Sequence, residues 1–155
     1  MRAADLHFSG SPTSRTLCQV RPPRPSSAGG DGAGEIGAVG EGVGGFAVGD
    51  RVVALTGFGG FATHFLADAT RTSKIPDAMP YEDAACFIFT HGTSHHALKD
   101  RAKLQPGESV LILGAAGGVG VAAIELAKAA GAKVIAAVSS DEKAAFCKDC
   151  GADET

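Results

Sequence analysis

The stretch SVLILGAAGGVGVAAIELAKAAGAKVIAAV, residues 109–138, decides the fold. Its first part, Ser109–Leu113, is a short apolar run with β-branched residues, and it follows the turn signal Gln105-Pro106-Gly107. This pattern predicts a strand that is buried on both faces. The glycine-rich run 114–120 begins directly after it.

A helix is predicted after the glycines, because apolar side chains recur at helical spacing. The predicted stripe consists of Val119, Ala122, Ala123, Leu126, Ala127 and Ala130. Gly131 stands where a helix is commonly closed by a left-handed residue. Residues 133–138 then form a second apolar strand. The stretch therefore predicts a βαβ unit in which a glycine-rich loop leads into the start of a helix.

The loop has the chemistry of a phosphate site. The first turn of a helix carries unpaired N–H groups and the positive end of the helix dipole. The spacing Ala115-x-Gly117-x-x-Gly120 matches the dinucleotide fingerprint, with alanine in the first glycine position. We expect the main chain of five residues to bind a diphosphate: Ala116, Gly117, Gly118, Val119 and Gly120. A glycine-rich turn that binds nothing is the alternative.

The residues after the second strand indicate which dinucleotide is bound. An NAD site usually has an acid about 20 residues beyond the loop, but Ser139 and Ser140 occupy that region here. Lys143 follows on the first turn of the next predicted helix. Two hydroxyls and an ammonium suit a 2′-phosphate, so we predict NADPH over NADH. The alternative is that Ser140 is only a helix cap and Lys143 only a surface residue. The adjacent acids, Asp141 and Glu142, also oppose the binding of a phosphate.

Composition excludes several classes of protein. The chain has 155 residues, a net charge of −3 and 20% charged residues, which argues against nucleic-acid binding. No apolar run approaches the length needed to span a membrane, so no membrane partner is expected. The four cysteines do not form a secreted disulfide framework, which favours the cytoplasm. Residues 1–28 are rich in arginine and serine, as mitochondrial transit peptides are, so a mitochondrial location is an alternative. Their prolines, however, oppose an amphipathic helix.

Four regions are predicted along the chain. Residues 1–28 are expected to be a poorly ordered arm. Residues 29–80 contain candidate strands at 34–39, 51–55 and 61–67 between glycine turns, which suggests a small, partly open β-barrel. Two linking helices are expected in 81–104, separated by Gly92 and with Thr93 or Ser94 capping the second. Residues 105–155 are the start of a nucleotide-binding domain.

Several of these segments together resemble one family. They are Gly49-Asp50-Arg51-Val52, Gly60-Phe61-Ala62, Gly92-Thr93-Ser94, Pro106–Leu111, Gly114–Gly120 and Gly151-Ala152-Asp153. The chain resembles the medium-chain dehydrogenase/reductase superfamily, in its zinc-independent, zeta-crystallin-like quinone oxidoreductase branch. The resemblance implies an α/β chain in which a partial GroES-like β-barrel precedes the first half of a doubly wound Rossmann sheet. It also implies NADPH as cofactor and quinones or α,β-unsaturated carbonyls as small-molecule substrates.

The resemblance has further consequences. It places Thr93 near the nicotinamide end of the cofactor. Relatives tend to pair as dimers through a Rossmann edge that this chain lacks, so a homodimer is compatible only with a full-length form. The chain contains at most half of a Rossmann domain, and we expect it to be a fragment. A truncated, non-catalytic remnant that keeps the dinucleotide turn is therefore an alternative function.

Zinc chemistry is the other alternative, because a sister branch contains zinc alcohol dehydrogenases. His91 and His95 would share a helix face only if Gly92 did not break the helix. Cys147-x-x-Cys150 is half of a structural zinc pattern, but its cysteines also fit a helix stripe that ends at Gly151. Gly30-Asp31-Gly32 replaces the Gly-His-Glu signature of zinc enzymes. We therefore predict no metal, and we name no catalytic side chain because the cofactor carries the chemistry.

Overall fold

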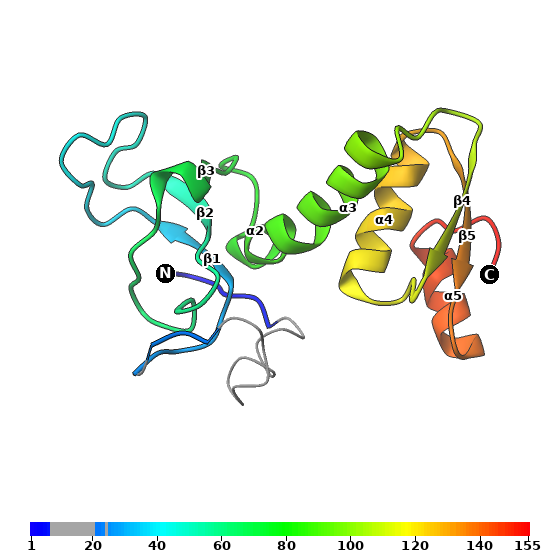
Figure 1. The fold of residues 1–155 in the computed structure, drawn as a ribbon, viewed down its shortest axis with the longest axis horizontal. Coiled ribbons are helices and arrows are strands. Elements are labelled where there is room, and N and C mark those ends of the chain that lie inside the picture. Colours follow the sequence, from blue (N-terminus) through cyan, green and yellow to red (C-terminus); the bar gives the residue numbers. More distant parts are fainter. Residues whose placement is uncertain (7–20, 24) are drawn as a thin grey trace. The chain divides into compact units, whose positions relative to one another are not determined.

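The computed structural model describes residues 1–6, 21–23 and 25–155 (Figure 1). The predicted arm 1–28 thus lies partly outside the described residues. The chain forms two compact units, Met1–Ile88 and Phe89–Thr155.

The first unit is built on a three-stranded antiparallel sheet in the order β1-β2-β3. Its strands are β1 (Asp31–Glu35), β2 (Arg51–Leu55) and β3 (Thr72–Lys74), and the short 3₁₀ helix η1 (Ala69–Arg71) precedes β3. Ala33 pairs with Val53, which in turn pairs with Ser73. Helix α2 (Tyr81–Phe87) follows, and its Ala84 and Ala85 are buried in the core of this unit.

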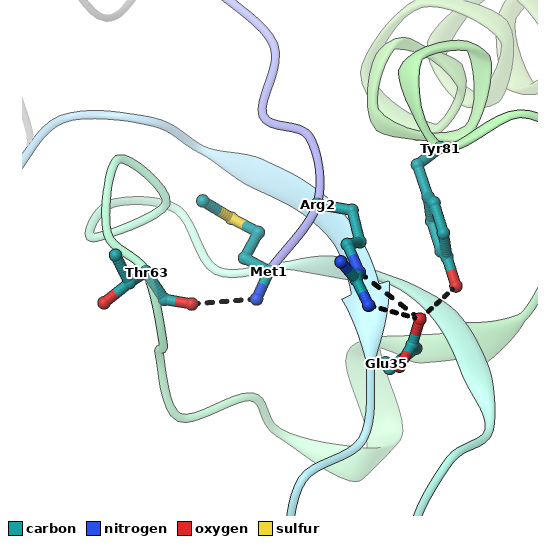
Figure 2. Close-up of polar contacts among 5 residues, drawn as sticks. All are labelled: Met1, Arg2, Glu35, Thr63 and Tyr81. Carbon is teal, nitrogen blue, oxygen red and sulfur yellow. Dashed lines mark hydrogen bonds and ion pairs between the residues drawn. The ribbon is translucent and has the colours of Figure 1, made fainter.

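Residues 1–3 lie along the free side of β1. The Ala3 and Ala33 backbones exchange hydrogen bonds of 2.8 and 3.1 Å. The glycines of β1 make this approach possible, because a Cβ at Gly34 would lie 2.9 Å from the Cα of Met1. The Arg2 guanidinium and the Tyr81 hydroxyl both donate to Oε1 of Glu35, at 3.1 and 3.2 Å (Figure 2).

Two of the three strands predicted in this unit are wrong in whole or in part. Residues 51–55 do form a strand, but β1 begins and ends earlier than the predicted 34–39. Residues 61–64 form bends and residues 65–67 have no regular structure, so the predicted strand is absent there. The Ala62 amide donates to the Gly60 carbonyl, and the Thr63 carbonyl accepts from the Met1 ammonium, so these backbone groups are used outside any ladder. Strand β3 has no apolar alternation and is formed by its pairing with β2.

The prediction that Gly92 breaks the linking helix is also wrong. Gly92 has helical angles of φ −61° and ψ −43°. Helical turns continue from η2 (Ile88–Gly92) through α3 (Thr93–His95) to η3 (His96–Arg101), and η2 and η3 are π-helical. Glycine lowers helix propensity by only about 1 kcal/mol relative to alanine, which neighbouring contacts easily offset.

The second unit begins with the helical turns of residues 89–101, and it contains the predicted βαβ unit and one further helix (Figure 1). The βαβ unit and the helix after it are formed by β4 (Ser109–Leu113), α4 (Gly118–Ala129), β5 (Lys133–Ala137) and α5 (Asp141–Asp149). The two strands are parallel, with Ser109 opposite Lys133 and Leu113 opposite Ala137. The bounds of the two strands agree with the predicted ones to within one residue. Gly131 follows α4 with φ +80°, as expected for a left-handed helix end.

The core of this unit occupies one face of the two strands. It includes Ile112, Val134 and Ala136 from the strands, Ile124 and Ala127 from α4, and Cys147 from α5. Leu111 and Leu113 point away from this core and are 62% and 76% exposed. The prediction that the first strand is buried on both faces is therefore wrong, because both helices contribute to the same core.

The helical stripe was placed slightly wrongly. Ala122 and Ala127 are fully buried as predicted, whereas Val119 is 41% exposed and Ile124, which was not in the stripe, is fully buried. Gly120 is also buried. Its missing side chain lets α4 lie close to the preceding loop, which rotates the buried face toward residues 120, 124 and 127.

Candidate dinucleotide site

The loop between β4 and α4 is a tight turn closed by its own backbone. The Gly117 amide donates to the Gly114 carbonyl at 3.0 Å, and Gly114 has φ +63°. The Ala115 amide donates to the carbonyl of Ala137, at the end of the neighbouring strand, at 3.3 Å. The loop is thus fixed to both strands at their carboxyl ends, where parallel sheets bind ligands.

Helix α4 begins with an uncapped first turn. Its N-cap is Gly117, in extended conformation, and among the described residues no side chain caps the helix. The amides of residues 118–120 belong to that first turn and have no acceptor within the helix. Together with the helix dipole, they form a site for an anion.

The glycines of the loop have different structural roles. A Cβ at Gly120 would lie 2.6 Å from the Ala115 carbonyl oxygen, so this residue must be glycine for the helix to pack on the loop. A Cβ at Gly118 would lie 3.1 Å from Cγ2 of Thr90. A Cβ at Gly117 would meet only the Gly114 carbonyl oxygen, at an ordinary 3.4 Å. A side chain at Gly117 would therefore obstruct a ligand in the pocket, but it would not clash with the rest of the protein.

A pocket of about 450 Å³ lies at this end of the two strands. Its lining consists of Gly114, Ala116, Gly117, Ala137, Val138, Ser139 and Lys143. Four of the nine predicted site residues are in this lining: Ala116, Gly117, Ser139 and Lys143. Sequence reasoning missed Gly114, Ala137 and Val138, although each lies at the carboxyl end of a predicted strand, where parallel strands form ligand sites.

The residues after β5 serve the pocket and the following helix at once. Oγ of Ser140 accepts a hydrogen bond from the Lys143 amide at 3.4 Å, so Ser140 is the cap of α5. The ammonium of Lys143 donates to Oγ of Ser139 at 3.3 Å. Ser139 and Lys143 thus place a hydroxyl and a positive charge side by side in the pocket lining. Asp141 and Glu142 are exposed in the first turn of α5.

Thr93 is not a helix cap, contrary to one of its two predicted roles. Its hydroxyl donates to the Phe89 carbonyl one turn earlier, at 2.5 Å, and its side chain is exposed. Two neighbours that were not predicted as site residues contact the start of α4 instead. The Ser94 hydroxyl donates to the Val119 carbonyl at 2.8 Å, and Thr90 packs against Gly118.

The candidate metal ligands are dispersed. Nε2 of His91 lies 3.0 Å from Oε2 of Glu125, while His95 is exposed. Cys147 is a free, fully buried thiol, and burial raises the pKa of the Cys150 thiol. In the described part of the chain, no three His, Cys, Asp or Glu side chains are arranged to hold a metal ion.

In the described ranges, no helix is both long enough and apolar enough to cross a bilayer.

The fold and site define a nucleotide-binding unit of the dehydrogenase type, and the family models agree. The alcohol dehydrogenase GroES-like domain matches residues 3–77, and the zinc-binding dehydrogenase domain matches residues 118–155. The chain belongs to the medium-chain dehydrogenase/reductase superfamily, in its quinone oxidoreductase branch. The expected fold class, a partial GroES-like barrel followed by the first half of a Rossmann sheet, is confirmed.

Individual relatives support the same branch. The chain is 42% identical to a quinone oxidoreductase of Pseudomonas aeruginosa over 136 residues, which are 86% of this chain and 42% of that protein. The Escherichia coli quinone oxidoreductase, solved in complex with NADPH, superposes with a TM-score of 0.91 and 32% identity over 99% of this chain and 47% of that one. The CurK enoyl reductase superposes with a TM-score of 0.87 and 32% identity, over 97% of this chain and 48% of that one. The chain thus spans about half the length, or less, of these relatives.

Proposed function

We propose that this chain binds NADPH at the carboxyl ends of β4 and β5. The observation that carries the proposal is that one pocket is lined by both the glycine turn and the Ser139–Lys143 pair. The diphosphate fits the uncapped first turn of α4, where Gly118, Val119 and Gly120 offer main-chain amides. The 2′-phosphate fits the hydroxyls of Ser139 and Ser140 and the ammonium of Lys143.

We further propose that the whole protein is an NADPH-dependent oxidoreductase of the quinone reductase type. When bound, NADPH supplies the hydride for reduction of a quinone or an α,β-unsaturated carbonyl. This chain's own residues hold and orient the cofactor, and Thr93 is our proposed contact near the nicotinamide. Relatives described as a quinone oxidoreductase and as an enoyl reductase support this substrate class, since both acceptors present a carbon–carbon double bond conjugated to a carbonyl.

We infer a metal-independent reaction in the cytoplasm. Gly30-Asp31-Gly32 stands where zinc enzymes of the superfamily have Gly-His-Glu, and Asp31 is fully buried in β1. Cys147 and Cys150 are free thiols, which suits a reducing compartment. Elemental analysis of the purified protein tests the metal inference, and stoichiometric zinc would favour an alcohol dehydrogenase.

The test begins with the full 155-residue chain and two titrations, one with NADPH and one with NADH, followed by fluorescence of the reduced nicotinamide. We expect saturable binding with NADPH tighter than NADH. Oxidation of NADPH by a simple quinone is then followed for this chain and for a longer form. Turnover by the 155-residue chain itself supports the oxidoreductase and excludes the remnant. Turnover only by the longer form supports an active whole protein in which this chain is a non-catalytic part. Binding without turnover in both supports a binding-only remnant, and absence of NADPH binding refutes the proposal.

A further inference from the structure

A buried hydroxyl contacts the first turn of α4, where the proposed phosphate site lies. Ser94 lies in α3 and is 2% exposed, and its Oγ donates to the Val119 carbonyl at 2.8 Å. Thr90, one turn earlier and 8% exposed, packs against Gly118. The start of α4 is therefore held by a neighbouring helical segment of the same compact unit.

The accepting carbonyl belongs to a particular peptide group. The C=O of Val119 and the N–H of Gly120 are parts of one planar unit. In a helix these two groups point in opposite directions along the axis, so the N–H points out of the N-terminus when the C=O points into the helix. A hydrogen bond to this carbonyl fixes the orientation of the Gly120 amide. It also polarises the peptide, which strengthens the amide as a donor.

Two neighbouring contacts limit how this peptide can turn. Gly120 packs directly on the Ala115 backbone, so the residue cannot shift toward the loop. His91 lies 3.0 Å from Glu125, more than one turn further along α4, and holds the same pair of segments together. Of these two polar contacts, the Ser94 bond to Val119 is nearer to the anion-binding amides than the His91–Glu125 contact is.

We propose that Ser94 is a positioning residue that orients and polarises the Val119–Gly120 peptide for binding a diphosphate. The proposal rests on the NADPH site proposed above. Ser94 does not touch the ligand and acts through the main chain of α4. Its hydroxyl therefore affects ligands that contain a diphosphate and spares ligands that lack one.

Ser94→Ala in the full chain tests this proposal, with Ser109→Ala, an exposed serine of the same unit, as the matched control. We expect Ser94→Ala to weaken NADPH binding by a few-fold and by no more than about 10-fold, the limit set by one neutral hydrogen bond. Adenosine 2′-monophosphate, which has no diphosphate, should compete equally well in both proteins. Ser94→Cys retains a weak donor and should fall between serine and alanine.

A second measurement needs no ligand. The ¹³C resonance of the Val119 carbonyl and the ¹⁵N resonance of the Gly120 amide should shift in Ser94→Ala, while the β4 and β5 resonances stay in place. Unchanged resonances at 119 and 120, or equal weakening of NADPH and adenosine 2′-monophosphate, would overturn the positioning role. If the unmodified chain fails to bind NADPH although its resonances respond to Ser94→Ala, the proposed cofactor is wrong and the contact itself is upheld.

Discussion

Gly120 packs on Ala115 so closely that a Cβ on the glycine would lie 2.6 Å from the carbonyl oxygen of the alanine. Gly120→Ala forces backbone atoms apart, and overpacking of this kind costs about 1–3 kcal/mol. We expect a lower free energy of unfolding for the second unit, measured by urea denaturation. Weaker NADPH binding should accompany it, because the first turn of α4 shifts.

Gly117→Ala separates binding from packing. Its Cβ would meet only the Gly114 carbonyl oxygen at 3.4 Å, so the free energy of unfolding should fall less than in Gly120→Ala, by the small cost of alanine at an N-cap. The added methyl lies in the pocket lining and should still weaken NADPH binding. Equal destabilisation by both substitutions would contradict the distinct roles assigned to these two glycines.

Lys143 is expected to decide between the two dinucleotides. Its ammonium lies in the pocket lining beside Ser139, and a hydrogen bond to a charged group contributes about 1.5–3 kcal/mol. Lys143→Ala should therefore weaken NADPH binding by about 10- to 100-fold and leave NADH binding nearly unchanged. Lys148→Ala, on the same helix but outside the lining, is the control. A parallel loss for both dinucleotides would show that Lys143 does not contact the 2′-phosphate.

The βαβ unit was predictable because its signals are local. The apolar runs, the glycine turn and the left-handed Gly131 are each read within a few residues, and parallel strands joined by a helix follow from their order. The pocket followed from the same reasoning, which placed Gly117, Ser139 and Lys143 at one end of the sheet. The exposure of Leu111 shows the limit, because an apolar side chain does not indicate which element covers it.

The first unit was less predictable because its structure depends on distant contacts. Strand β1 is rich in glycine, which disfavours strands, yet it forms because it pairs with β2 over its whole length, and residues 1–3 approach closely across Gly34 on its other side. Strand β3 exists through its pairing with β2. Likewise Ser94 was considered only as a helix cap, since no local pattern indicates that its hydroxyl reaches a carbonyl 25 residues away.

Arg51 should be hard to replace in the first unit. Its guanidinium donates to the backbone carbonyls of Pro76, Asp77 and Met79, and it lies 4.4 Å from the centre of the Tyr81 ring. Lysine has one compact ammonium and cannot bridge three carbonyls while stacking on a ring. We expect Arg51→Lys to lower the free energy of unfolding by about 1–3 kcal/mol, with the exposed Arg71→Lys as control. Equal midpoints for the two variants would refute this role.

Asp153 should make the stability of the second unit depend on pH. Its carboxylate accepts from the Lys128 ammonium and from the Val134 amide, each at 2.7 Å. These bonds, the Lys128 bond foremost, hold the pKa of Asp153 below its usual 3.8. A carboxyl with a depressed pKa stabilises the fold above the unfolded-state pKa, and this stability is lost as pH falls through the folded-state value.

The urea midpoint of the unmodified chain should therefore fall as the pH drops below the usual carboxyl range, where this carboxylate becomes protonated. Asp153→Asn keeps one acceptor oxygen but no charge, so it should be less stable at neutral pH and show a flatter acid profile. Asp149→Asn, exposed at the end of α5, should retain the profile of the unmodified chain. If the Asp153→Asn and Asp149→Asn profiles coincide, the bonds of the Asp153 carboxylate to Lys128 of α4 and to the Val134 amide of β5 do not stabilise the unit in the way that their geometry indicates.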